Sequence, residues 1–286
     1  MMIEIAQQIL NGLVIGSVYV LVALGLTVIF GILGIAHFAH GSVAMFGGYL
    51  TFYFTQRLGI SFFPAMLLAM PVGMVLGVLL ERLAYRPVRD DPHINAFIIA
   101  LGLTLLIDKL NLLAFGADQV VIPTSYREVH SFAGLAIVEL RLYVLLTAVT
   151  LVALMSALIT RTKLGRAIRA VAQNRPAAIL MGVDVNRVSS AVFAVSSALG
   201  IAAGALVGAL FAIAPGVGDG LVIKGFAVLI LGGLGSIPGA IVGGLVLGVS
   251  ETLAAGLISS AYKDVIAFLV MIGVLLFKPE GLLGKR

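Results

Sequence analysis

The sequence contains no cysteine among its 286 residues. That absence excludes disulfides, thiolate metal sites and cysteine nucleophiles, and with them several classes of membrane enzyme. Charge is also scarce, since only 11% of the residues are Asp, Glu, Lys or Arg. No stretch matches the phosphate-binding pattern G-x-x-x-x-G-K-[ST]. Any energy taken from ATP would therefore have to come from another chain.

Apolar residues make up 61% of the chain, and the mean hydropathy is +1.17. Long, nearly uncharged runs exceed the roughly 20 residues that cross a bilayer core. Such runs form helices, because lipid leaves every backbone polar group to be satisfied within the fold. The alternating pattern of a membrane barrel is absent from the sequence. We therefore expect an all-α, polytopic integral membrane protein, folded as one transmembrane domain over residues 1–286.

About nine spans are expected, although eight or ten would also fit the pattern. They cover residues 5–30, 41–55, 62–80, 94–115, 142–160, 188–214, 221–234, 238–257 and 265–277. The second and seventh are short and glycine-rich, so either could be a broken or re-entrant segment. The first is too long for a cleavable signal and is expected to be retained. Glycines at helical spacing in the spans predict close packing, within the chain or at a subunit interface.

Basic residues gather in two of the loops between these spans. Arg82, Arg86 and Arg89 lie in one loop, and residues 161–187 form the other. Both are predicted to be cytoplasmic, because cytoplasmic loops carry an excess of Lys and Arg. The C-terminus then lies inside, the N-terminus lies outside, and residues 116–141 form the largest external loop. The net charge of +5 thus reports topology and not a nucleic-acid partner.

Polar side chains interrupt the apolar sequence after the first span, in the stretch GIAHFAHGSVAMFGGYL. It contains His37 and His40, and then Gly41 and Ser42 where the next helix is expected to start. Irregular backbone is tolerated at membrane depth only where protein buries it or water lines it. The histidines could therefore cap and brace a helix break, or they could line a translocation path. A metal site is a third interpretation, but it lacks another ligand nearby in the sequence.

A second glycine-punctuated break is expected within residues 230–244, at Gly232, Gly233 and Gly235. Like residues 29–48, this stretch has a span end, a break and a new helix start. Chance similarity is one explanation in a chain with 34 glycines. A structural repeat is the other, and with the predicted topology its two copies would run parallel.

Few ionisable residues lie in or near the spans. They are Asp108, Lys109, Lys224, Glu251, Lys263 and Asp264. All are predicted to lie toward the external ends of their spans, where they would snorkel, pair at an interface, line a vestibule or meet a partner. An ion-coupled carrier is expected to hold a carboxylate near the midplane, and an enzyme a cluster of His, Asp or Ser at common depth. The sequence predicts neither arrangement.

The loop at residues 162–188 is both basic and amphipathic. Its apolar positions are Ile168, Val171, Ala172, Ile179, Leu180 and Met181. Pro176 is suited to a helix start and Gly182 to a helix stop. A segment of this kind either lies on anionic headgroups or docks a cytoplasmic partner.

Five stretches follow one another along essentially the whole chain. They are AHFAHGSVAMFGGYL, ERLAYRPVR, GRAIRAVAQNRPAAILMGVDVNRV, VLILGGLGSIPGAIVGG and KPEGLLG. In this order they resemble the LivH-type permease subunits of branched-chain amino acid ABC importers. The resemblance implies a multi-pass subunit of the bacterial inner membrane that performs no catalysis and binds no cofactor itself. It also implies a LivM-like sister permease, two ATPase subunits that bind ATP and magnesium, and a periplasmic substrate-binding protein.

The resemblance also implies roles for particular residues. A coupling element that meets an ATPase groove is implied at residues 165–182. Its candidate residues are Gly165, Arg166, Arg169, Ala172, Asn174 and Gly182. The family usually has a His-Gly-acid step where this chain has His40, Gly41 and Ser42, so the resemblance carries over no charge at residue 42. Related permeases serve urea and short amides, which is the alternative substrate class, and a stand-alone secondary carrier is a weaker alternative.

Overall fold

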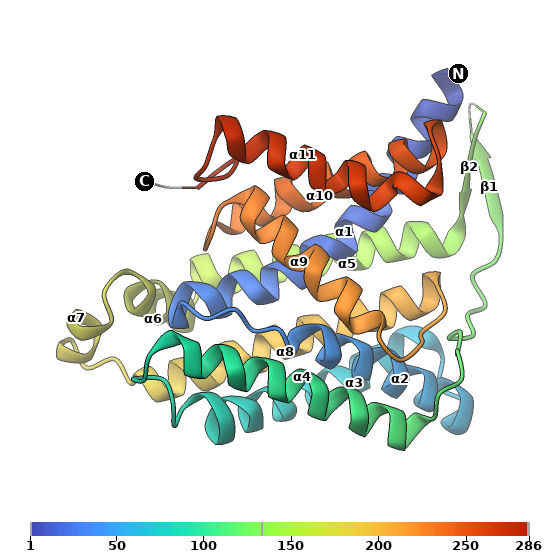
Figure 1. Cartoon of the computed structure of the whole chain (residues 1–286). Coiled ribbons are helices and arrows are strands. Elements are labelled where there is room, and N and C mark those ends of the chain that lie inside the picture. Colours follow the sequence, from blue (N-terminus) through green and yellow to red (C-terminus); the bar gives the residue numbers. More distant parts are fainter. Residues whose placement is uncertain (1, 133, 285–286) are drawn as a thin grey trace.

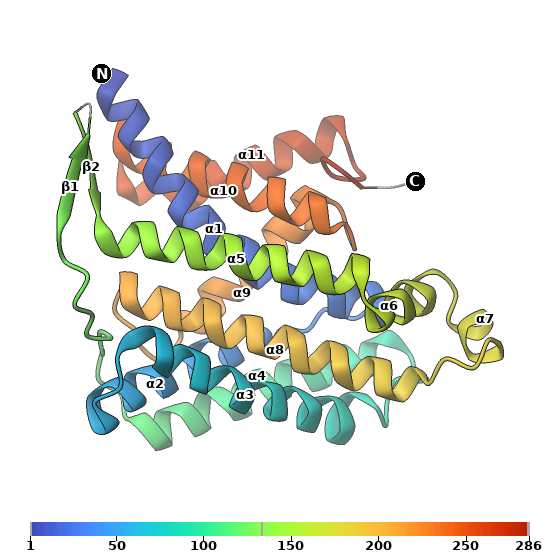
Figure 2. The same cartoon turned by 180° about the vertical axis from the view of Figure 1, so that it is seen from behind.

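The computed structural model describes residues 2–132 and 134–284, and Figure 1 shows the course of the chain. Its elements are α1 (Met2–Leu33), α2 (His40–Leu58), α3 (Phe62–Leu80), the π-helical turn η1 (Glu81–Tyr85), α4 (His93–Phe115), β1 (Val129–Phe132), β2 (Leu135–Val138), α5 (Glu139–Arg161), α6 (Lys163–Gln173), α7 (Arg175–Leu180), α8 (Val185–Leu210), α9 (Val217–Gly232), α10 (Ile237–Leu257), the 3₁₀ turn η2 (Ser260–Tyr262) and α11 (Lys263–Phe277). The β1–β2 hairpin and the α6–α7 segment lie at opposite ends of the helical bundle (Figures 1 and 2).

Seven helices in the described part of the chain are long and apolar enough to cross a membrane. They are α1, α3 with η1, α4, α5, α8, α10, and α11 with η2. The all-α, polytopic fold is therefore confirmed. Each predicted span corresponds to a helix, and the two that do not meet the length and apolarity of a crossing are α2 and α9. These are the spans that were expected to be broken or re-entrant.

The helices α1 and α8 form the centre of the bundle. Their most apolar windows are 78% and 89% buried, against 22% for α4 and α5 and 6% for α11. The helix α10 packs along α1, while α2 and α3 pack along α8. Glycines allow these close approaches: a Cβ on Gly248 would lie 2.4 Å from the Gly16 Cα. The glycine spacing therefore serves packing within the chain, which was one of its two interpretations.

Two connections turn back into the bundle instead of crossing it. Residues 34–39 join α1 to α2, and residues 211–216 join α8 to α9. Gly34 has φ +65° and Gly216 has φ +91°, a backbone region that glycine reaches without steric cost. As a result, α2 and α9 begin inside the bundle and run toward opposite ends of it (Figures 1 and 2).

The break at residues 211–216 corrects the predicted span 188–214, because α8 ends at Leu210. Like residues 34–39, it separates a long helix from a shorter one, whereas the sequence had suggested residues 230–244 as the similar stretch. The connection at residues 233–236 is instead a tight turn, with φ +106° at Gly233 and +77° at Gly235, after which Ser236 caps α10. It is a helix break, as predicted, but it does not re-enter the bundle.

The long loop at residues 116–141, which was predicted to be external, contains regular structure. It contains the antiparallel β1–β2 hairpin, in which Val129 lies opposite Val138. Upstream of the hairpin, Val120 and Ile213 exchange both backbone hydrogen bonds, with N to O distances of 2.9 and 2.7 Å. The Ile122 N–H donates to the Gly208 carbonyl at 3.1 Å. The loop is thereby attached to the connection between α8 and α9.

Candidate functional site

The starts of α2 and α9 touch through their backbones. A Cβ placed on Gly41 would lie 2.0 Å from the Gly218 carbonyl oxygen, and one on Gly218 would lie 2.7 Å from the Gly41 carbonyl oxygen. Neither distance leaves room for a side chain, so this contact requires glycine at both positions. Gly41 therefore lies at the junction of the two re-entrant segments.

His37 and His40 are buried beside this junction. They are 1% and 0% exposed, and their ring centroids are 5.9 Å apart. The Tyr85 hydroxyl lies 2.7 Å from His37 Nδ1, and the His40 ring fits against glycines of α1 and α8. Within the described residues, the His40 ring nitrogens have no hydrogen-bonding partner, and no group of three His, Asp or Glu is arranged to hold a metal. This burial favours the interpretation that the histidines brace the break.

Ser42 extends the junction toward α4. Its hydroxyl donates to the Thr104 carbonyl at 3.5 Å, and its carbonyl accepts a hydrogen bond from Asn111 Nδ2 at 3.3 Å. Asp108, from the same helix, also lies near Ser42. The fold thus brings a carboxylate from α4 next to residue 42. Sequence reasoning missed Asn111, whose polar side chain in an apolar helix is the signal that could have identified it.

The other predicted path residues lie elsewhere. Gly232, Gly233 and Gly235 form the turn at the far end of α9 from the Gly41 junction. Gly232 packs against the backbone of Gly239, and the C-terminal segment covers the turn through Leu283, whose N–H donates to the Gly232 carbonyl at 3.0 Å. The structure therefore separates these glycines from His37 and His40.

A buried ionic cluster joins α1, α9, α10 and α11. Lys224 forms ion pairs with Glu251 and with Asp264, the latter at 2.6 Å. The Tyr19 hydroxyl donates to Glu251 Oε2 at 2.8 Å, and Glu251 is only 4% exposed. These ion pairs bring Lys224 close to the second half of α10 and the first turn of α11, and its position toward an external span end stays a prediction. Three of the six ionisable residues pair across helices, as one interpretation had proposed.

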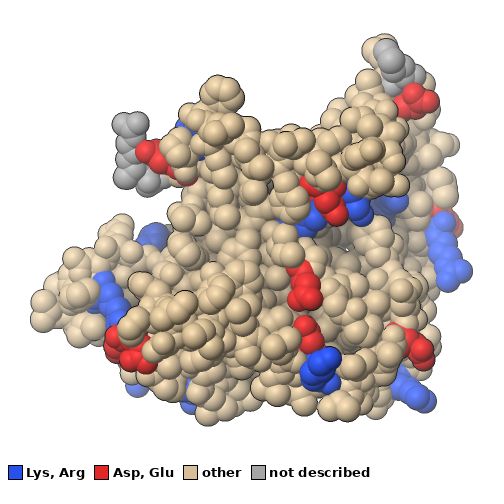
Figure 3. Space-filling model, viewed as in Figure 1, with Lys and Arg blue, Asp and Glu red and all other residues tan. Residues whose placement is uncertain are grey.

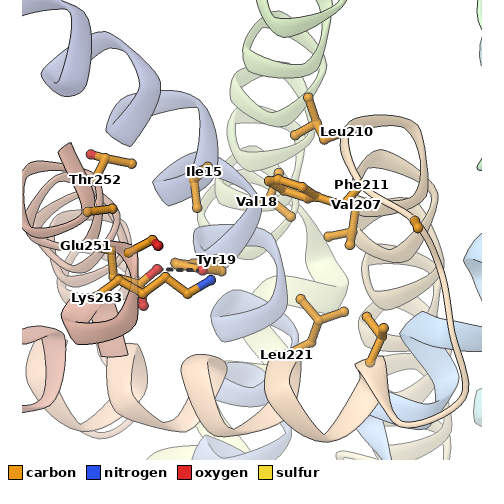
Figure 4. Close-up of a pocket in the computed structure, with 14 residues that line it drawn as sticks. Ile15, Val18, Tyr19, Val207, Leu210, Phe211, Leu221, Glu251, Thr252 and Lys263 are labelled. Carbon is orange, nitrogen blue, oxygen red and sulfur yellow. Dashed lines mark hydrogen bonds between the residues drawn. The ribbon is translucent and has the colours of Figure 1, made fainter. Parts of the chain in front are cut away.

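A cavity of about 460 Å³ lies beside this cluster, and Figure 4 shows its lining. Most of the wall is apolar and comes from α1, α8, α9 and the connection between α8 and α9; it includes Ile15, Val18, Val207, Leu210, Phe211 and Leu221. Tyr19, Glu251, Thr252 and Lys263 give the cavity one polar side. The space-filling view shows a hollow on this face of the molecule, with charged side chains at its rim (Figure 3).

The segment that was predicted to couple to an ATPase contains two capped helices. The Thr162 hydroxyl accepts a hydrogen bond from the Gly165 N–H at 3.0 Å and caps α6, and Asn174 caps α7 through the Ala177 N–H at 2.9 Å. Gly165 packs against the end of α5, where a Cβ would lie 2.2 Å from the Ile159 carbonyl oxygen. Gly182 has φ +81° just after α7, as expected of a helix stop.

The predicted contact residues of this segment take different positions. Arg166 and Ala172 are exposed on α6, while Arg169 hydrogen bonds to the Ile159 carbonyl. The most exposed apolar residues are Ile179 at 51%, Leu180 at 87% and Met181 at 84%. They form the tip of α7, which projects past the ends of the long helices in Figures 1 and 2. We refer to these three residues as the α7 tip.

The two basic loops lie at the same end of the bundle. Arg175 forms an ion pair with Asp90 at 2.8 Å, and Arg89 donates to the Asn186 side chain at 2.9 Å. The Arg175 guanidinium, through its hydrogen bond and its charge, lowers the pKa of the Asp90 carboxyl. Arg86, from the same loop as Arg89, donates hydrogen bonds to Glu81 in η1 and to Ser190 in α8. The loops that were predicted to share one side of the membrane therefore hold each other in place.

Comparison with known protein families shows to which family this chain belongs. Residues 8–275 match the family described as "Branched-chain amino acid transport system / permease component". The chain belongs to this permease family. The permease is 35% identical to the high-affinity branched-chain amino acid transport system permease protein BraD of Pseudomonas aeruginosa, over 98% of this chain and 95% of that protein.

Two further relatives span nearly the same length. The permease is 35% identical to the high-affinity branched-chain amino acid transport system permease protein LivH of Escherichia coli K12, over 98% of this chain and 95% of that protein. It is 32% identical to the probable branched-chain amino acid transport permease protein LivH of Methanocaldococcus jannaschii, over 97% of this chain and 92% of that protein. The resemblance that the motifs indicated is therefore confirmed, and the chain is a multi-pass membrane transport subunit.

Proposed function

We propose that this permease is one transmembrane subunit of an ATP-driven importer for branched-chain amino acids. The names of its relatives support the substrate class. The subunit would work with a LivM-like sister permease, two ATPase subunits and a periplasmic binding protein. ATP and magnesium would be bound by the ATPase subunits, because this sequence lacks the phosphate-binding pattern.

The α7 tip is the observation that carries this proposal. Its three apolar side chains are exposed, and in Figure 1 the helix α7 lies beyond the ends of the long helices. Exposed apolar patches of this kind mark protein interaction sites. An importer that binds ATP on separate subunits needs such a contact on its cytoplasmic side, and the basic residues of both neighbouring loops favour that side. The N-terminus would then be periplasmic and the C-terminus cytoplasmic.

The packing offers a route from this contact to the junction of α2 and α9. The segment α6–α7 connects α5 to α8, and α8 packs along α2. A movement of the α7 tip on ATP binding would be transmitted through α8 to the helix that starts at His40. The contact between Gly41 and Gly218 would then open or close a path shared with the sister subunit.

Reconstitution of the complete importer in liposomes tests this function. We expect uptake of labelled leucine, isoleucine and valine that depends on ATP and on the loaded binding protein. Labelled urea and acetamide belong in the same assay, because uptake of either in place of the amino acids would identify the alternative substrate class. Uptake that continues without ATP and without the ATPase subunits would contradict the proposal.

A further inference from the structure

We propose that the cavity bordered by α1, α8, α9, α10 and α11 binds the zwitterion of an amino acid with a branched aliphatic side chain as it passes through the permease. This inference rests on the proposed function and assigns it a binding site. The cavity volume of about 460 Å³ falls within the range of small-molecule sites, about 300–1,000 Å³. It is large enough for an amino acid together with water.

The apolar wall suits the side chain of such a ligand. Val18 is 2% exposed and Leu221 is 7% exposed, so the packing around these side chains holds them in place. Ile15, Val207 and Leu210 complete a surface of branched side chains from three helices. Burying an aliphatic group against this wall is favourable because it removes apolar surface from water.

The polar side of the cavity presents charges of both signs. Lys263 lines it, and the Lys263 side chain forms no ion pair or hydrogen bond among the described residues. In Figure 4 its ammonium points toward the side of the cavity where Tyr19 and Glu251 meet. A ligand carboxylate would pair with Lys263, and the ligand ammonium would pair with Glu251.

Charge balance favours a zwitterion over an acid or an amine. Around the cavity, Lys224 and Lys263 supply two positive charges, and Glu251 and Asp264 supply two negative charges. A zwitterion adds one charge of each sign, so the cluster stays neutral when the ligand is bound. A free carboxylic acid anion or an amine would leave one charge uncompensated in a mostly apolar cavity, which is costly.

Uptake by the complete importer in liposomes, at saturating loaded binding protein, tests the site. Lys263→Gln removes the cation, and we expect it to lower leucine uptake about ten-fold, because it removes a charge-assisted hydrogen bond from the bound ligand. Lys263→Arg keeps the charge and should retain most of the uptake. Lys109→Gln is the matched control, since Lys109 is an exposed lysine near the end of α4 and does not line the cavity. It should leave uptake unchanged.

A second variant probes the volume of the cavity without altering its charge. Ala255 lines the cavity, and Ala255→Phe should place a ring inside it. We expect this variant to reduce leucine and isoleucine uptake more than valine uptake, because the larger ligands need the space that the ring occupies. The assembled complex should keep its sister permease and ATPase subunits in both variants.

The outcomes separate this inference from the function on which it rests. If the unmodified importer takes up leucine and both Lys263→Gln and Ala255→Phe do so equally well, the cavity is not the binding site, although the permease function stands. Release of the sister permease by Lys263→Gln would also overturn the inference, because Lys263 would then belong to a subunit interface. An unmodified importer that takes up no branched-chain amino acid would overturn both proposals.

Discussion

At the scale of the residue, one of the close backbone contacts in the permease lies between two glycines. Gly41 and Gly218 bring two helix starts together at a distance that no other residue allows. The neighbouring histidines are buried, which favours a role in shaping this junction. Adding a single methyl group at the junction should therefore destabilise the permease more than losing a hydrogen bond of an imidazole ring does.

Gly41→Ala should lower the thermal stability of the permease. The added Cβ meets the Gly218 carbonyl oxygen, and such overpacking costs about 1–3 kcal/mol. Gly41→Leu should abolish uptake while the partner subunits still assemble. Melting temperature in detergent and uptake in liposomes measure the two effects. Gly102→Ala is the control, because nothing lies within 4 Å of its Cβ position, and a variant at Gly41 that melts no lower than this control would contradict the packing argument.

The buried ion pair leads to a second prediction at this scale. Lys224→Met leaves Glu251 buried without its cation, which should destabilise the permease by about 3–5 kcal/mol. Adding Glu251→Gln to this variant removes the unpaired charge and should restore part of the loss. Unfolding in a detergent titration measures both variants. Equal stability of the single and the double variant would show that the two residues are not coupled.

At the scale of the element, the length of the apolar runs predicted the long helices. The breaks between helices are marked only by short turn signals, which are weaker. Apolar runs identified all the crossings, because the bilayer sets their length. The break at residues 211–216 was missed because its residues are themselves apolar, although Pro215 and Gly216 are a turn signal that could have ended the span earlier. The cluster around Lys224 could not be predicted, since its partners come from other helices and only the fold brings them together.

The α7 tip carries the prediction at this scale. Leu180→Glu with Met181→Glu places charges on the exposed apolar surface, and burying them against an ATPase would cost several kcal/mol. We expect the ATPase subunits to be lost on purification and substrate-stimulated ATP hydrolysis to fall. Lys163→Gln with Arg166→Gln tests the membrane-surface alternative, which predicts weaker headgroup attraction by about 1 kcal/mol for each charge and intact ATPase binding. If the tip variant keeps its ATPases, the α7 tip is not the docking surface.

At the scale of the whole molecule, the two ends of the bundle differ in kind. One end carries the hairpin β1–β2 and the long loop before it, and the other carries α6, α7 and the basic loop at residues 86–91. The N-terminus lies with the first group and the C-terminal segment with the second (Figure 1). Assigning one end to the cytoplasm therefore assigns the whole chain.

Cysteine labelling tests that assignment directly, because the chain has no cysteine of its own. Ser125→Cys should react with a membrane-impermeant maleimide added to intact spheroplasts, and Gln173→Cys should react only after the membrane is opened. Both positions are exposed, so a lack of reaction would reflect the membrane and not burial in the protein. The reverse labelling pattern would place α6 and α7 on the periplasmic side and would remove the basis for ATPase docking there.

The short ladder between Val120 and Ile213 has a kinetic consequence. The Val120 and Ile213 amides bond to each other's carbonyls outside any helix, and the Ile122 amide donates to the Gly208 carbonyl in the last turn of α8. One detachment of the loop from the connection between α8 and α9 exposes all three amides together. Their hydrogen-deuterium exchange should therefore give one common opening free energy, lower than that of the α8 interior, and a loaded binding protein that presses on the loop should raise it for all three amides together.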